Sequence, residues 1–432
     1  MAKDEVRVGI LGMGVVGGGV YQVLTGNADE ITQRLGRPLT VARVADIDWD
    51  RERDFDVPED VRTTDATDVT AADDIDIVVE TIGSITPALD MVMGAIAHGK
   101  SVVTSNKELI AKHGDEILAA AAAKGVDVEF EGAVAGAIPI IRSLKESLEA
   151  NRILEVSGIL NGTTNYILTR MTDEGLAFDD ALAQAQELGY AEADPTNDVE
   201  GIDAKYKIAI LSAIAFGHRV DVDDIVSEGI SGIAPADIEY AREMGYAIKL
   251  LAIARRVGDG ERLDVRVHPT LVEHEHPLAR VSGVFNAIWV VGEACDQIML
   301  QGRGAGSLPT GNAVAGDVMD CARNVISGTR NRVPCTCVGQ ADIVPLDEIE
   351  TATYVRMAVR DQPGVLGTIA TILGQEGVSI QSVVQRNADD DVAEIVWIMH
   401  PGEEKKLRSA LDAIGRLGIV ERVRSVIRVM QP

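Results

Sequence analysis

One segment near the N-terminus decides the fold of the first part of the chain: Val6-Arg7-Val8-Gly9-Ile10-Leu11-Gly12-Met13-Gly14-Val15-Val16-Gly17. Its first half is a short apolar run, which is typical of a strand buried in a parallel sheet. The run ends in a G-x-G-x-x-G turn and then becomes helical, so that successive glycines allow a tight turn, a close pyrophosphate and helix–strand packing. A glycine-rich turn without a ligand would show the same pattern. We predict a dinucleotide site with contacts at Gly12, Met13, Gly14, Val15, Val16 and Gly17.

Strand and helix patterns alternate through the rest of this region. A strand is expected at residues 39–45, another with its turn at residues 75–83, and a third at residues 101–104. This alternation predicts an α/β fold, a doubly wound parallel sheet of the Rossmann type over residues 1–150. Asp46 at the end of the second strand is predicted to bind a coenzyme ribose, which favours NAD, whereas nearby arginines leave NADP open.

A lysine follows the strand at residues 101–104, in the sequence Ser105-Asn106-Lys107. The carboxyl ends of parallel strands are where such sheets bind ligands. A lysine in the first turn of a helix is unfavourable, because the helix dipole attracts anions there. Lys107 therefore indicates a ligand site, and the alternative is a solvated residue that begins a helix.

The stretch from Ala191 to Lys207 carries the densest chemistry of the chain. An acidic loop leads into a helical pattern over residues 198–216, in which Gly201 is the one expected interruption. Asp203 falls inside the apolar stripe of this pattern, and a carboxylate that faces a core needs a partner. Lys207 lies at the edge, so a structural ion pair and a substrate site both fit. The stripe consists of Val199, Ile202, Tyr206, Ala209, Ile210, Ala213 and Ile214.

This stretch resembles the substrate-binding signature of homoserine dehydrogenases, in which an E-A-D-P segment precedes D-V-x-G-x-D-A-x-x-K. The resemblance continues in T-x-N-K at residues 104–107, N-G-T-T-N-Y at residues 161–166 and a G-x-G-A-G turn at residues 302–306. It implies that Lys107 and Lys207 are catalytic and that Ser105, Lys107 and Gly306 contact the coenzyme. The implied substrate-binding residues are Glu192, Asp198, Asp203, Asn161, Gly162 and Thr163.

A further resemblance concerns the turn at residues 131–139, which matches E-x-x-V-x-G-x-x-P. In the family this turn holds a structural sodium ion, and oxygen ligands of this kind suit a hard cation. A plain turn would explain the pattern equally well without an ion. The candidate ligands are Glu131, Val134, Gly136 and Ile138.

The pattern changes after residue 150. Residues 151–327 are expected to form an α+β substrate and dimerisation domain, with residues 302–327 returning against the Rossmann domain. A linker at residues 328–351 precedes a β-α-β-β-α-β pattern at residues 352–432. This ferredoxin-like unit resembles an ACT domain, and L-threonine is the expected effector, whereas a dimer module that binds nothing is the alternative. The effector contacts would be Asp361, Gly364, Val365 and Leu366.

Composition limits the other possibilities. The formal net charge is −28, and only 11 of the 40 basic residues are lysine, so no basic run is available to follow a nucleic-acid backbone. No apolar run is long enough to span a membrane, and no signal peptide is recognisable, so we expect a cytoplasmic enzyme. The seven histidines form no metal signature. Four cysteines are expected to be packing thiols, namely Cys295, Cys321, Cys335 and Cys337.

The resemblance covers nearly the whole chain and implies a monofunctional homoserine dehydrogenase, without an aspartate kinase domain. Such an enzyme uses NAD(P)H to interconvert L-aspartate 4-semialdehyde and L-homoserine, in the biosynthesis of threonine, methionine and isoleucine. A homodimer or homotetramer is expected. The alternatives are another NAD(P)-dependent dehydrogenase of a small amino acid or aldehyde, and a non-catalytic amino-acid sensor.

Overall fold

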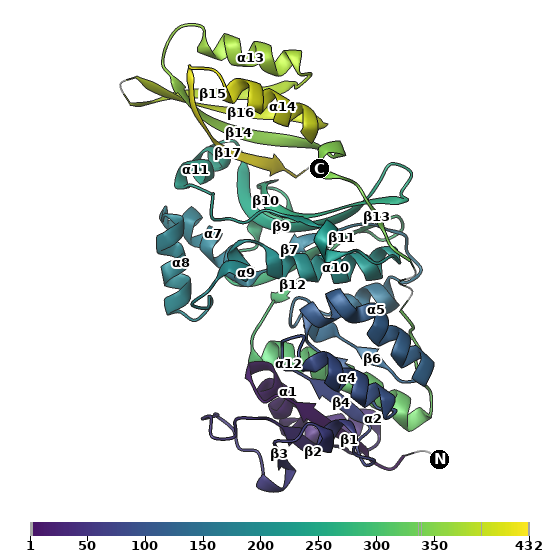
Figure 1. Ribbon diagram of the computed structural model, residues 1–432. Helices are drawn as coiled ribbons and strands as arrows, with labels where there is room; N and C mark the ends of the chain where they lie inside the picture. Colours follow the sequence, from purple (N-terminus) through teal and green to yellow (C-terminus); the bar gives the residue numbers. More distant parts are fainter. Residues whose placement is uncertain (1–2, 336, 338, 390, 431–432) are drawn as a thin grey trace. The chain divides into compact units, whose positions relative to one another are not determined.

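The computed structural model describes residues 3–335, 337, 339–389 and 391–430 (Figure 1). The chain divides into two compact units, each made of three segments. The first unit combines Met1–Val156, Tyr206–Val222 and Asn286–Ala341. The second unit combines Ser157–Lys205, Asp223–Phe285 and Asp342–Pro432.

The first unit contains a six-stranded parallel sheet with the order β3-β2-β1-β4-β5-β6. This arrangement confirms the predicted Rossmann-type fold. Its strands are β1 (Val6–Leu11), β2 (Leu39–Ala45), β3 (Arg62–Thr63), β4 (Ile77–Glu80), β5 (Ser101–Thr104) and β6 (Val128–Glu129). Its helices include α1 (Val15–Gly26), α2 (Ala28–Leu35), α3 (Thr67–Thr70), α4 (Ala88–Ala97), α5 (Lys107–Lys124), α6 (Ile140–Arg142) and α12 (Ser307–Ser327). Outside this sheet, β11 (Phe285–Gly292) is hydrogen-bonded to β12 (Asp296–Arg303).

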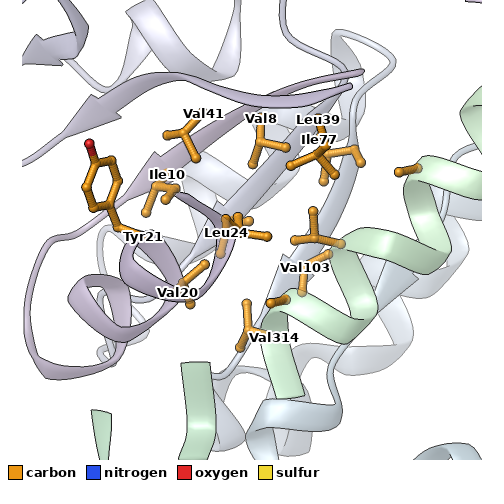
Figure 2. Close-up of a cluster of buried hydrophobic side chains, with 14 of the residues drawn as sticks. Val8, Ile10, Val20, Tyr21, Leu24, Leu39, Val41, Ile77, Val103 and Val314 are labelled. Carbon is orange, nitrogen blue, oxygen red and sulfur yellow. The ribbon is translucent and has the colours of Figure 1, made fainter. Parts of the chain in front are cut away.

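The core of this unit joins segments that are about 300 residues apart in sequence. Figure 2 shows Val8 and Ile10 of β1 near Val20 of α1, with Val314 of α12 closing the cluster. Helix α12 approaches α1 at Gly19, where an added Cβ would lie 2.0 Å from the Ser307 carbonyl oxygen. The late helix therefore completes the apolar layer over the first strands, a contact that requires glycine.

The second unit contains strands in the order β9-β10-β17-β14-β16-β15, and the short strands β8 and β13 also pair with β10. Neighbours are antiparallel except where β10 meets β17, β8 and β13. The strands are β8 (Val226–Ser227), β9 (Tyr246–Val257), β10 (Arg262–Glu273), β13 (Asp342–Ile343), β14 (Glu350–Arg360), β15 (Ile380–Asp389), β16 (Val392–Glu403) and β17 (Val420–Val429). Strand β7 (Ile153–Ile159) begins in the first unit and ends in the second. Helix α10 (Ile202–Phe216) begins in the second unit and ends in the first. The remaining helices are α7 (Gly162–Glu174), α8 (Phe178–Glu187), α9 (Thr196–Val199), α11 (Pro235–Glu243), α13 (Val365–Gln375) and α14 (Glu404–Gly415).

The C-terminal part of the second unit runs β14-α13-β15-β16-α14-β17, which confirms the predicted β-α-β-β-α-β order. Helices α13 and α14 pack on one face of these strands, around the fully buried Trp397. Side chains on the opposite face of the strands contact α11. The sheet of this C-terminal part therefore has helices on both faces.

Two expectations about local structure are wrong. The predicted stripe on residues 198–216 is not the most buried face, because Ala204, Ile208 and Leu211 on the opposite face are fully buried. Most residues around the helix are apolar, so the sequence pattern does not define one buried side. The expectation of four thiols fails for Cys335 and Cys337, which form a disulfide with Cα atoms 5.6 Å apart.

Among the described residues, no helix combines the length and the apolar character needed to cross a bilayer.

Candidate active site

The glycine-rich turn lies between β1 and α1, and its glycines differ in what surrounds them. Gly12 has φ +90°, and an added Cβ at Gly17 would lie 2.0 Å from the Gly12 carbonyl oxygen. These two glycines are required by the turn and by helix packing. An added Cβ at Gly14, the N-cap of α1, would meet no atom of the chain within 4 Å. Open space beside a helix N-terminus fits the approach of a coenzyme pyrophosphate.

Asp46 follows β2, at the predicted ribose end of the site. Its carboxylate accepts hydrogen bonds from the amides of Met13 at 2.5 Å and Asp48 at 2.8 Å. The Arg53 guanidinium lies 3.8 Å from the same carboxylate and stacks over the Trp49 ring. This end of the site therefore has the Asp46 carboxylate beside the Arg53 guanidinium. The carboxylate suits a ribose diol, and the guanidinium suits a phosphate.

The first predicted lysine begins α5. Asn106 is the N-cap of this helix, since its side-chain oxygen accepts from the Leu109 amide at 3.1 Å. Lys107 is the first residue of the helix, and Ser105 precedes the cap. The cap explains how a cation can occupy a helix N-terminus, because the Asn106 side chain satisfies one of the free amides there.

The second predicted lysine, Lys207, is 8% exposed and lies on α10. The hydroxyl of its neighbour Tyr206 donates to the carboxylate of Glu108 at 3.3 Å. The Lys112 ammonium group lies 5.3 Å from the centre of the Tyr206 ring. Residues adjacent to the two predicted lysines therefore contact each other, although 98 positions separate Glu108 from Tyr206 in the sequence.

Two of the three predicted acidic residues of the second unit accept hydrogen bonds from the same side-chain amide. The Asn161 side-chain nitrogen donates to Asp198 at 2.7 Å and to Asp203 at 3.0 Å. Its side-chain oxygen accepts from the Thr164 amide at 2.8 Å, which makes Asn161 the N-cap of α7. Asn161 thus orients two carboxylates, whereas Glu192 lies in the exposed loop before α9.

The neighbouring residues of this turn have different positions. Gly162 begins α7, and the Thr163 hydroxyl donates to the Tyr190 carbonyl at 2.8 Å. Asp203 lies in the first turn of α10, and Lys207 follows one turn later on the same helix. The bond from Thr163 ties the start of α7 to the loop that leads towards α9.

The predicted cation turn has an unusual backbone. Ala135 and Gly136 both have positive φ, 54° and 53°, and this conformation is strained for alanine. An added Cβ at Gly136 would lie 2.7 Å from Gly304, so this turn packs on the G-x-G-A-G turn. The Glu131 carboxylate accepts from the Ile141 and Arg142 amides, both at 2.8 Å. Because that side chain caps α6, a cation would depend on backbone carbonyl groups.

Other candidate positions lie at helix starts. Gly306 has φ +126° and is the N-cap of α12. Gly364, at the predicted effector turn, has φ +91° and is the N-cap of α13. Val365 beside it is buried, whereas Leu366 is exposed. Within the described part of the chain, no group of three or more His, Cys, Asp or Glu side chains could hold a metal ion.

Comparisons with known proteins agree along the whole chain. Residues 139–319 match the model of the homoserine dehydrogenase family, residues 12–131 match its NAD-binding domain, and residues 353–418 match the ACT domain. Homoserine dehydrogenase from Neisseria gonorrhoeae is 45% identical over 430 residues, which cover 98% of each chain. The chain belongs to the homoserine dehydrogenase family.

Solved structures support this assignment. A homoserine dehydrogenase from Thiobacillus denitrificans is 45% identical and superposes with a TM-score of 0.92, covering 99% of this chain and 98% of that one. A hyperthermophilic archaeal homoserine dehydrogenase in complex with NADPH is 27% identical, with a TM-score of 0.62 over 73% of this chain and 97% of that one. The expected function is confirmed: this homoserine dehydrogenase is an NAD(P)-dependent oxidoreductase that interconverts L-aspartate 4-semialdehyde and L-homoserine.

Sequence reasoning gave no role to Glu80, one of several buried acids of this homoserine dehydrogenase. Glu80 ends β4 and is completely buried. Burial raises the pKa of its carboxyl above the ordinary value, and hydrogen bonds from Thr104 and the Ile82 amide act in the opposite direction. An acid at the end of an otherwise apolar strand was the available signal, because a buried carboxylate requires donors nearby.

Proposed function

We propose that Lys107 and Lys207 form the catalytic pair of this homoserine dehydrogenase. The observation that supports this most directly is the hydrogen bond between Tyr206 and Glu108, the residues adjacent to the two lysines. Bound NAD(P)H supplies the hydride for the aldehyde carbon. One ammonium group donates a proton to the forming alkoxide, and the other stabilises its negative charge.

The test is steady-state kinetics of Lys107→Ala and Lys207→Ala. Each variant is expected to lower kcat on the order of 10²–10⁴-fold while NADPH binding stays close to that of the unmodified enzyme, because proton transfer is lost. Lys205→Ala is the matched control, since Lys205 lies on the same helix and is half-buried. Unchanged turnover in both test variants would refute the assignment.

The carboxylates held by Asn161 are proposed to bind the substrate ammonium group. Asp198 and Asp203 both accept hydrogen bonds from Asn161, which holds the two carboxylates close together. The substrate ammonium group can then donate hydrogen bonds to both carboxylates. Glu192 is assigned to the same role from its motif alone, and Gly162 and Thr163 to the substrate carboxylate. Asp203→Asn is expected to raise KM for the amino-acid substrate far more than KM for NADPH. An equal rise in both constants would contradict this role.

The glycine-rich turn is proposed to bind the coenzyme pyrophosphate. Gly14→Ala tests this cleanly, because the added methyl group would meet no atom of the chain within 4 Å. It is expected to weaken NADPH binding without changing the melting temperature. Gly26→Ala, which also adds a methyl group in open space, is the control at the far end of α1. Gly306 and Ser105 are proposed as further coenzyme contacts.

A sodium ion is proposed at the turn formed by residues 131–138, bound by main-chain oxygens of the four predicted ligands Glu131, Val134, Gly136 and Ile138. The paired left-handed residues Ala135 and Gly136 support this, because a strained backbone persists where surrounding interactions hold it. Thermal unfolding in matched sodium chloride and choline chloride is the test. A higher melting temperature in sodium is expected, and equal values would argue against the ion.

Regulation and assembly remain proposals of the same kind. L-Threonine is proposed to bind at Asp361, Gly364, Val365 and Leu366, so Asp361→Asn should abolish inhibition by L-threonine, with D-threonine as the control ligand.

A homodimer or homotetramer is supported by β15, the last strand of its sheet, where Val383 is 41% exposed. Light scattering should show more than one chain. A cytoplasmic location is proposed for this biosynthetic enzyme, and cell fractionation would test it.

A further inference from the structure

Glu80 is a buried acid that the proposed catalytic chemistry does not use. It ends β4 after three apolar residues, and its exposed fraction is 0%. A buried carboxylate without donors costs several kcal/mol, on the order of the cost of a lost core side chain. Its position therefore requires an explanation in terms of what its two oxygens hold.

The two oxygens of Glu80 hold two different segments. Oε1 accepts from the Ile82 amide at 2.6 Å and the Gly83 amide at 3.4 Å, which fixes the turn after β4. Oε2 accepts from the Thr104 hydroxyl at 2.5 Å, at the end of the neighbouring strand β5. The carboxylate thus ties together the ends of two adjacent parallel strands, the edge at which such sheets bind ligands.

Thr104 connects Glu80 to the start of α5 through hydrogen bonds. Its hydroxyl proton points to Glu80, so its oxygen is free to accept from the Asn106 amide, at 3.0 Å. The Asn106 side-chain nitrogen donates to the Ser84 carbonyl at 2.9 Å, and its oxygen caps the helix at Leu109. The hydrogen bonds therefore form a closed ring that includes both turns and the residue immediately before Lys107.

The adjacent residue extends the ring towards the coenzyme turn. The Thr81 hydroxyl lies 3.0 Å from the Leu11 carbonyl oxygen and 2.9 Å from that of Gly12, and donates to one of them. Thr81 therefore contacts the glycine-rich turn, and Glu80 contacts Thr104, two residues before the N-cap of α5.

We propose that Glu80 and Thr104 are positioning residues for Lys107, which orient the first turn of α5 against the coenzyme turn. This inference depends on the proposed catalytic role of Lys107. Displacement of a reacting group by about 1 Å can cost on the order of 10²-fold in rate. A ring of hydrogen bonds next to the lysine limits such displacement, whereas a role in stability alone would leave kcat unchanged in the folded enzyme.

The experiment compares Thr104→Val, which removes the hydroxyl at nearly constant volume, with Thr104→Ser, which keeps it. Thr104→Val is expected to lower kcat about 10- to 100-fold with NADPH affinity nearly unchanged, and Thr104→Ser is expected to retain most of the turnover. Glu80→Gln leaves one acceptor oxygen where the Thr104 hydroxyl and the turn amides use two, so the ring cannot form completely. This variant should also lower kcat, and it provides a second test if Thr104→Val folds poorly.

The decisive measurement repeats Thr104→Val in the Lys107→Ala background. If Thr104 acts through Lys107, the second substitution should not lower the residual rate further, because non-additive effects identify residues that act as a unit. The same fold-loss in both backgrounds, or unchanged kcat in Thr104→Val, overturns the proposal. Normal turnover in Lys107→Ala alone would instead refute the catalytic assignment.

Ser101→Ala is the matched control at the opposite end of β5. Ser101 is also fully buried, and its hydroxyl interacts with Asp127 rather than with the turn before Lys107. This variant is expected to change stability but leave kcat unchanged. A loss of kcat as large as that of Thr104→Val would show that any buried hydroxyl of this strand matters, and the specific ring would lose its support.

Discussion

A buried ion pair joins Arg356 of the ACT part to Asp237 of α11, and substitution of Arg356 with methionine should reveal its contribution. Asp237 of α11 is completely buried and accepts from the Arg356 guanidinium twice, at 2.7 Å and 3.0 Å. It also accepts from the Tyr354 hydroxyl at 3.1 Å and the Ser425 hydroxyl at 2.8 Å. Arg356→Met keeps the apolar part of the side chain but leaves Asp237 without its cation, and it also removes the hydrogen bond from Arg356 to Glu394 at 2.8 Å.

The expected loss in the free energy of unfolding is about 3–5 kcal/mol, which is the cost of leaving one charge of a buried pair uncompensated. The two hydroxyl donors remain, so the carboxylate keeps part of its solvation. In the double variant Asp237→Asn with Arg356→Met, no unpaired charge is left on α11. That variant should lose only about 1–2 kcal/mol relative to the unmodified enzyme.

Urea unfolding followed by the fluorescence of Trp397, which is 1% exposed in the ACT core, measures this loss. Trp49 and Trp289 are replaced by phenylalanine in the reference protein, so that one tryptophan reports. With a slope of about 3 kcal/mol per M, the midpoint for Arg356→Met should fall by about 1 M or more. A change below about 0.5 kcal/mol, or a double variant as unstable as the sum of the single variants, would refute the reasoning.

Three other predictions concern the pH dependence of stability, helix packing and coenzyme choice. Burial lowers the pKa of Lys249 to about 8 from its ordinary value of 10.5. Between pH 8 and pH 10.5, Lys249 binds a proton in the unfolded chain but not in the folded one. The free energy of unfolding should therefore rise by about 3 kcal/mol across this pH range, and Lys249→Met should lack that rise. Gly19→Ala should lower the melting temperature by several degrees because its methyl group would clash with the Ser307 carbonyl, whereas Gly26→Ala should not, as calorimetry would show. Arg53→Ala should reduce kcat/KM with NADPH more than with NADH, because a cation near the ribose binds a 2′-phosphate, and equal losses would exclude this role.

Much of the fold was predictable because local pattern and long-range packing agree. β1, β2 and β5 have the bounds that their apolar runs predicted. The helix beginning at Lys107 and the six elements of the ACT part also follow from periodicity and turn residues. These elements place apolar residues at the spacing that one buried face requires, so neighbours in sequence determine them.

The candidate site was less predictable, because its parts come from distant segments. Motifs identified Asn161 and Asp203 separately, but only the structure shows that one amide binds both Asp203 and Asp198. Glu80 carries no motif, and its role depends on Thr104 of another strand. The stripe predicted on α10 failed because that helix is apolar on several sides, so its orientation depends on the surfaces that pack against it.

The sequence by itself determined the order of strands and helices, the glycine-rich turn and the resemblance to homoserine dehydrogenases, since each depends on residues close together in the chain. Only the tertiary structure decided that Tyr206 contacts Glu108 beside the two lysines and that Asp237 pairs with Arg356. Hydrogen bonds and ion pairs act over a few ångströms, and folding alone decides which distant residues come within that distance.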